Sequence, residues 1–174
     1  MKYLKNTIKE YFLLNPTKRL RVREIERILK LPLPSIIRYC KELKEEGILT
    51  TEKIGNVTLY KASREKEYLL EKKLFNIKSI HESGLIEYLK QELNNPPIIL
   101  FGSYSKGEDT EESDIDIYVE TPSKKQIRTE KYNKLLKRNI QLFTYKSTRD
   151  IPNTHLANNI LNGLILNGQI EVFK

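Results

Sequence analysis

The stretch IILFGSYSKGEDTEESDIDIYVE, residues 98–120, constrains the fold and chemistry of this chain more than any other. It opens with an apolar run long enough for a short buried strand, and Gly102 ends that strand. Further along, acidic and apolar residues alternate from Asp114 onward. Because side chains two residues apart in a strand share a face, we expect Asp114 and Asp116 to lie side by side.

Two carboxylates held this close repel each other unless a cation lies between them. A hard divalent ion such as Mg²⁺ prefers oxygen ligands and fits that position. The glycine turn lets backbone N–H groups approach an anion closely, and the start of a following helix adds its positive end. The stretch therefore predicts a site for a metal ion and a triphosphate.

The ordered combination of these features resembles the DNA polymerase β-like nucleotidyltransferase superfamily, and most closely its minimal nucleotidyltransferase domains of prokaryotic, archaeal type. The residues that carry the resemblance are Gly102, Ser103, Gly107, Ser113, Asp114, Ile115 and Asp116. The resemblance implies transfer of a nucleoside monophosphate from an NTP to an acceptor hydroxyl, with Mg²⁺ in a two-metal arrangement. It also assigns the candidate residues: Asp114 and Asp116 as catalytic and metal-binding, and Gly102, Ser103 and Gly107 as nucleotide-binding.

One position departs from this pattern. The family places a third carboxylate on the next strand, predicted here at residues 140–145, where the alternation puts Gln141 on the polar face. A glutamine amide carries no charge and cannot act as a general base. Two readings stay open: a nucleotidyltransferase of reduced activity, or a catalytically degenerate DNA-binding regulator or antitoxin-like protein. The acidic residues of the preceding loop are interpreted as solvated charges: Asp109, Glu111 and Glu112.

The charge of the chain is concentrated in its first half. Residues 1–78 hold 19 Lys and Arg against 10 Asp and Glu, whereas residues 79–174 hold 12 against 13. The resulting net charges are +9 and −1, which recover the total of +8. A basic half joined to a nearly neutral half indicates a nucleic-acid surface in the N-terminal part.

The pattern of residues 1–62 indicates a small domain with a helical part and a hairpin. Helical apolar spacing is expected at 3–14, 21–29 and 35–46, and two strands at 48–54 and 57–61 joined by Gly55-Asn56. This order resembles the winged helix-turn-helix of prokaryotic transcriptional regulators. The resemblance implies DNA contacts from the recognition helix and wing, through Ile37, Arg38, Lys41, Lys53 and Lys61. A dimerisation or protein-docking module is the alternative.

The rest of the chain predicts a linker helix at 63–78 and a nucleotidyltransferase-like domain at 79–174, giving a two-domain α/β (α+β) protein. Its mixed sheet is expected to carry helices on one side. Helices are predicted at 64–75, 77–93, 124–139 and 150–161, with Gly84 as a possible break in the second, and strands at 98–101, 114–119 and 140–145. A homodimer through the linker helix or the winged helix is a further expectation.

Cysteine content and hydropathy indicate a cytoplasmic location. A single cysteine, Cys40, excludes an internal disulfide framework and fits a reducing compartment. No apolar run approaches the ~20 residues that a membrane-spanning helix needs. We therefore expect a protein that works without a membrane partner.

Overall fold

A computed structural model describes residues 2–171 of the chain, which divides into two compact units, residues 1–72 and 73–174. The division falls inside the segment 63–78 that the sequence predicts as a linker helix. Each unit has its own set of buried apolar side chains.

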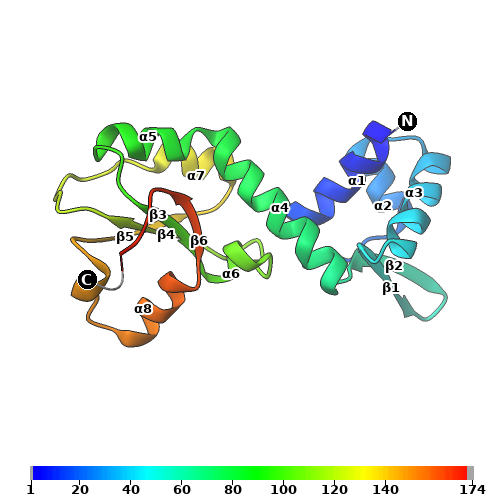
Figure 1. Ribbon diagram of the computed structural model, residues 1–174. Helices are drawn as coiled ribbons and strands as arrows, with labels where there is room; N and C mark the ends of the chain where they lie inside the picture. Colours follow the sequence, from blue (N-terminus) through cyan, green and yellow to red (C-terminus); the bar gives the residue numbers. More distant parts are fainter. Residues whose placement is uncertain (1, 172–174) are drawn as a thin grey trace. The chain divides into compact units, whose positions relative to one another are not determined.

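The N-terminal unit contains three helices followed by a hairpin, in the order that the sequence predicts (Figure 1). The elements are α1 (Lys2–Leu14), α2 (Val22–Leu29), α3 (Leu33–Glu45), β1 (Leu49–Ile54) and β2 (Val57–Ala62). The strands pair antiparallel, and a bridge between Leu20 and Tyr60 adds one more backbone pairing beside β2. Cys40 is fully buried, and burial raises the pKa of its thiol to about 12. This thiol is a packing group rather than a reactive one.

A single helix, α4 (Lys66–Ser83), crosses the division between the units, and it corrects the prediction of separate helices at 64–75 and 77–93. Asn76 lies inside this helix, and its side chain bonds to groups outside the helix. The break comes at Gly84, whose φ of +77° begins α5 (Leu85–Glu92). None of the helices in residues 2–171 is both long and apolar enough to span a membrane.

The C-terminal unit is built on a four-stranded mixed sheet of order β5-β4-β3-β6. The strands are β3 (Ile98–Phe101), β4 (Ile115–Glu120), β5 (Ile140–Tyr145) and β6 (Leu164–Asn167). β3 pairs antiparallel with both β4 and β6, whereas β4 and β5 run parallel. The mixed sheet that the sequence predicts is therefore present.

Helices cover both faces of this sheet, which corrects the expectation of helices on one side (Figure 1). Alternate residues of the strands point to α5 and α7 (Glu130–Leu136) on one face, as Ile115 and Ile117 do. The residues between them, Tyr118 among them, pack against Ile151 and Ile160 on the other face. That second face is covered by α8 (Thr154–Leu161), which begins after the capping side chain of Asn153.

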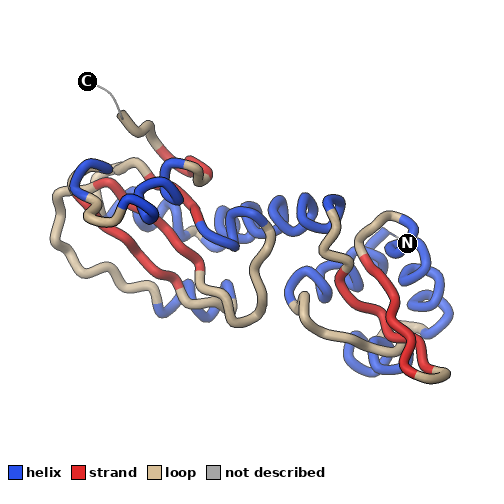
Figure 2. The backbone as a smooth tube through the Cα atoms, turned by 90° about the horizontal axis from the view of Figure 1, so that it is seen from below, coloured by secondary structure: helices blue, strands red, loops and turns tan. Residues whose placement is uncertain are grey.

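The connection from β4 to β5 is mostly loop, and its one helix is α7 (Glu130–Leu136), so the predicted helix at 124–139 is too long (Figure 2). Ile127 is the sole apolar residue of 124–129, and a stretch with one apolar side chain cannot bury a helical face. The predicted helix at 150–161 is shortened in the same way to α8. Pro152 keeps Ile151 out of helical backbone angles, and the Asn153 side chain then caps the helix that starts at Thr154.

Candidate functional site

The pairing of β4 with β3 and β5 fixes the positions of Asp114 and Asp116 on the sheet. Asp116 lies opposite Phe101 of β3 and opposite Gln141 of β5. Asp114 directly precedes β4, so it shares the face of Asp116, while Ile115 points to the opposite core. The structure thus brings both predicted carboxylates to one end of the sheet.

Gly102 allows the Asp116 carboxylate to lie against the start of α6 (Gly102–Lys106). Gly102 has a φ of +73°, which side-chain-bearing residues rarely adopt. A Cβ built on it would overlap the Oδ2 atom of Asp116 well inside van der Waals contact. Both the backbone angle and the space therefore require glycine. The unpaired N–H groups at a helix start favour an anion, here the carboxylate or a phosphate.

The environment of Asp116 disfavours its charged form. Burial raises the pKa of the Asp116 carboxyl, and the charge of Asp114 raises it further. The carboxylate pair is therefore under electrostatic strain that a cation between the two groups would relieve.

Gln141 lies at the position where a third carboxylate is expected, and its amide is turned toward the pair. Its Nε2 atom donates a hydrogen bond of 2.6 Å to Oδ2 of Asp114. A donor at this position supplies a partial positive charge to Asp114 and no additional anionic ligand. The side chain is exposed to solvent, so the amide can turn away from Asp114 without leaving a buried group unpaired.

Ser103 and Gly107 occupy opposite ends of α6. Ser103 follows Gly102 in the first turn of the helix. Gly107 ends the helix with a φ of +77°, and its N–H donates to the carbonyl of Ser103. The structure brings Gly102 to the Asp116 carboxylate, whereas it gives Gly107 a helix-ending role. Contact between Gly107 and a nucleotide stays a prediction.

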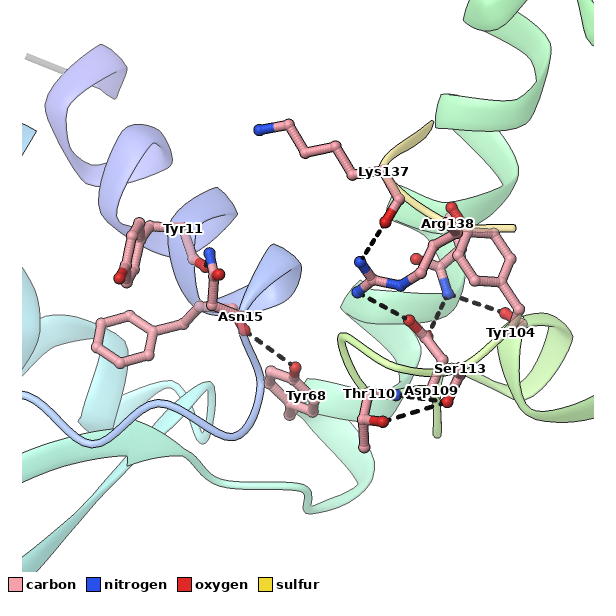
Figure 3. Close-up of polar contacts among 11 residues, drawn as sticks. Tyr11, Asn15, Tyr68, Tyr104, Asp109, Thr110, Ser113, Lys137 and Arg138 are labelled. Atoms are coloured by element: carbon pink, nitrogen blue, oxygen red, sulfur yellow. Dashed lines mark hydrogen bonds and ion pairs between the residues drawn. The ribbon is translucent and has the colours of Figure 1, made fainter. Parts of the chain in front are cut away.

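A buried polar network joins the segment that leads into β4 to the segment that leads into β5 (Figure 3). Asp109 is 2% exposed, which makes the prediction of a solvated charge wrong. Its carboxylate lies 3.7 Å from Nη2 of Arg138 and accepts a 2.7 Å hydrogen bond from Asn76. Asn76 also donates to the carbonyl of Tyr104, and Arg138 donates to the carbonyl of Lys137.

This network was missed by the sequence reasoning because its members lie far apart in the chain. Asn76 comes from α4, Asp109 from the loop after α6, and Arg138 from the segment before β5. None of them sits in a local pattern. The nearest sequence signal is Arg138 itself, a charged residue only two positions before the apolar β5.

The donor set fits one hard divalent ion held by Asp114 and Asp116. Two strained carboxylates and a solvent-exposed amide are suitable for Mg²⁺, which commonly uses one or two protein carboxylates and completes its shell with phosphates and water. A third acid is not available here, since no group of three or more His, Cys, Asp or Glu side chains in residues 2–171 is arranged to hold a metal.

The predicted DNA-contact residues lie on α3 and the hairpin of the N-terminal unit. Ile37 is 49% exposed, and Lys41 is also exposed, with Glu45 4.0 Å away. Arg38 lies over the ring of Tyr39 and 3.7 Å from Glu42. Lys53 is exposed near the hairpin turn. Lys61 pairs with Glu52 at 2.9 Å, so part of its charge is already compensated.

Comparison with known families addresses the C-terminal unit. Residues 82–165 match the family model of the nucleotidyltransferase domain. The C-terminal part of the chain is therefore similar to a nucleotidyltransferase domain, which supports that part of the resemblance predicted from the sequence. The matched range includes Gly102, Asp114, Asp116 and Gln141. No curated protein and no solved structure matches the chain.

Replacing Gly102 by alanine is expected to destabilise the protein more than the backbone angle alone explains. The matched control is Gly84→Ala, because Gly84 has a φ of +77° and no atom near its added Cβ. Gly84→Ala should cost about 1–2 kcal/mol. Gly102→Ala should cost about 1–3 kcal/mol more, because Asp116 must move. Denaturant unfolding of both variants measures the difference, and equal losses would contradict the close approach.

Asp116→Asn is expected to raise the melting temperature at neutral pH in the absence of metal. The pKa of the Asp116 carboxyl is higher in the folded protein than in the unfolded chain. Ionisation of this carboxyl therefore lowers the free energy of unfolding as the pH rises. The gain should be absent at low pH, grow as the pH rises from the ordinary Asp value of about 3.9 through the raised pKa, and then level off. Thermal unfolding across pH measures it. A gain that stays constant with pH would show that the effect is not electrostatic.

Proposed function

We propose that the C-terminal unit is an Mg²⁺-dependent nucleotidyltransferase that moves a nucleoside monophosphate from an NTP to an acceptor hydroxyl. The observation that carries the proposal is the placement of Asp114 and Asp116 on one strand face against Gly102. In the reaction, the acceptor oxygen bonds to the α-phosphorus, and the bond from that phosphorus to the bridging oxygen breaks. Pyrophosphate leaves with the electron pair, and the hydroxyl proton passes to solvent water.

Each residue of the site has a role in this proposal. Asp114 and Asp116 supply the carboxylate oxygens that hold the metal ion, and Gly102 leaves the space that the Asp116 carboxylate fills at the α6 start. The hydroxyl of Ser103 donates to a phosphate oxygen. When bound, Mg²⁺ neutralises charge on the triphosphate and on the leaving pyrophosphate. The residues fit one such ion. A two-metal arrangement lacks its third acidic ligand here.

Gln141 makes the proposed reaction slow. The amide donates to Asp114 and has no basic group with which to accept the acceptor's proton. Loss of a general base typically reduces the rate ~10²–10⁴-fold. The contact between Gln141 and Asp114 also supports the second candidate function, a regulator that binds a nucleotide without turning it over.

Calorimetric titration with Mg²⁺ and ATP tests whether the site binds a nucleotide. Transfer of a labelled nucleotide then distinguishes a slow nucleotidyltransferase from a nucleotide-binding regulator. Wild type should bind ATP only with Mg²⁺, and Asp116→Asn should bind at least about tenfold more weakly, since one of two carboxylate ligands is lost. Gln141→Glu should increase transfer from α-labelled ATP to an acceptor about 10²-fold or more, because a carboxylate is restored.

The control variant for this experiment is Thr144→Glu, a second exposed position of β5 that adds the same charge away from the pair. ATP binding with no transfer in wild type or in Gln141→Glu would favour the nucleotide-binding regulator. Failure of ATP to bind at millimolar concentration would sink both forms of the proposal.

For the N-terminal unit we propose a winged helix-turn-helix that binds duplex DNA. In support, α3 exposes Ile37, Arg38 and Lys41 on the side away from its buried residues. The hairpin exposes Lys53, and the bridge from Leu20 to Tyr60 ties it to the helices. Several basic side chains of this unit are already paired with acids, Lys61 among them. Arg38 and Lys41 also lie 3.7 Å and 4.0 Å from glutamates, Glu42 and Glu45, so DNA must draw these side chains away from exposed partners. Lys53 has no acid within ion-pair distance among the described residues.

Reversing Arg38 and Lys41 to glutamate should weaken duplex binding and reduce its salt dependence. Each lost phosphate contact lowers the slope of log affinity against log salt by about 1. The control is the double variant Lys66→Glu and Lys78→Glu on α4, which changes the net charge equally. Fluorescence anisotropy over a salt series measures both. Equal losses in the two variants would mean that only the total charge of the chain matters.

A further inference from the structure

We propose that the connection from β4 to β5 binds the phosphate backbone of a single-stranded nucleic acid and that this strand carries the acceptor of the transfer reaction. The binding surface, called the crossover track below, consists of Lys124, Arg128, Lys131, Lys134 and Lys137. The assignment of the strand as acceptor rests on the proposed nucleotidyltransferase function. The binding surface itself does not depend on that function.

Charge is strongly separated within the C-terminal unit. Residues 124–138 hold seven Lys and Arg and one Glu, a net charge of +6. The remainder of residues 79–174 holds five basic and twelve acidic residues, a net charge of −7. The nearly neutral charge of the whole unit therefore conceals one basic segment and an acidic remainder that includes the carboxylate pair.

The cations of the crossover track are exposed, and no acid lies within ion-pair distance of them among residues 2–171. The two other basic residues of the segment do have acidic partners, Glu92 for Lys125 and Asp109 for Arg138. By contrast, many basic residues of the N-terminal unit are paired with a neighbouring Glu, as Lys61 is. Uncompensated cations are the groups that gain most from binding a polyanion, because they release its counterions.

The fold directs this segment to the carboxylates. Since β4 and β5 are parallel, the chain must return along the full length of the sheet between them. It leaves beside Tyr145, where the N–H of Thr121 is bonded, and arrives beside Asp114, where Asn139 accepts from Ile115. The path covers about 17 Å, since a parallel strand rises ~3.3 Å per residue over five residues.

Track residues recur every three or four positions along this path, and the last of them lies at the carboxylate end. Lys131 and Lys134 are both exposed on α7, and the Nζ atom of Lys131 lies 5.6 Å from the centroid of the Tyr132 ring. Lys137 ends α7, and its side chain points away from the Asp109–Arg138 network (Figure 3). A strand lying on the track would therefore end near the carboxylates of β4.

Charge complementarity selects the partner. The acidic loop beside the carboxylates repels an anionic acceptor, so such an acceptor needs a cationic surface nearby to hold it. A nucleic-acid strand has both the regular anionic backbone that fits a line of cations and hydroxyl groups that can receive a nucleotide. An acidic protein would also bind these cations, and competition by poly-glutamate detects that alternative.

The test measures binding of fluorescein-labelled single-stranded RNA and DNA oligonucleotides to the full chain by anisotropy. Both track and control variants are made in the Arg38→Glu, Lys41→Glu background, which removes the proposed duplex surface. The track variant neutralises three side chains, Lys124→Gln, Lys131→Gln and Lys134→Gln. The control variant neutralises three others of the same unit, Lys90→Gln, Lys146→Gln and Arg149→Gln. The two variants carry the same net charge.

The track variant should lose at least about tenfold in affinity at low salt, and its salt slope should fall by about 2, since each single-strand phosphate contact contributes ~0.7. The control variant should bind like its parent. Equal effects of the two variants, or no effect of either, would overturn the proposal. So would competition by poly-glutamate as effective as that by an unlabelled oligonucleotide, which would indicate an acidic protein partner.

Two further readouts separate this inference from the proposed enzymatic function. Binding of ATP with Mg²⁺, measured by calorimetry, should be unchanged in the track variant. Track-dependent strand binding without any labelled transfer would keep the surface and refute its role in catalysis. Intact ATP binding and transfer to another acceptor, without track-dependent strand binding, would refute the surface and keep the enzyme. Comparison of the RNA and DNA arms identifies which strand is preferred.

Discussion

The repulsion between the carboxylates of Asp114 and Asp116 is the constraint on which the site depends. The strand alternation of β4 places both groups on one face, and Gly102 leaves the space into which Asp116 fits. Gln141 relieves the repulsion only as a hydrogen-bond donor to Asp114. The raised pKa of Asp116 is the sign that the strain persists in the folded chain. The site is therefore prepared for a cation before any ligand arrives.

The buried ion pair of Asp109 and Arg138 fixes the positions of the two segments that lead to the carboxylates. Asp109 lies five residues before Asp114, and Arg138 lies three residues before Gln141, so one ion pair ties together both segments that lead into the site. A buried ion pair is tolerated when further hydrogen bonds satisfy its groups. Asn76 and the carbonyl of Lys137 supply such bonds.

Features that depend on neighbouring residues were predictable from the sequence, whereas features that depend on distant ones were not. Alternation alone places Asp114 and Asp116 together, and a local turn signal gives the hairpin at Gly55. The burial of Asp109 depends on Arg138 and Asn76, which no local pattern links to it. Likewise, the second covered face of the sheet unites Tyr118 with Ile160, which lie far apart in the chain. The predicted helix at 124–139 was too long for a local reason, since residues 124–129 contain a single apolar side chain, Ile127.

Because α4 is continuous across the division, the two units cannot be separated there without cutting a helix. On the N-terminal side of the division, Tyr68 donates to the carbonyl of Phe12, and on the C-terminal side Asn76 holds Asp109. Cutting the chain between Lys72 and Lys73 would leave helical pieces of seven and eleven residues from the eighteen of α4. Helices shorter than ~12–15 residues are marginal by themselves. Recombination of either unit with a foreign partner must therefore carry the whole helix with it.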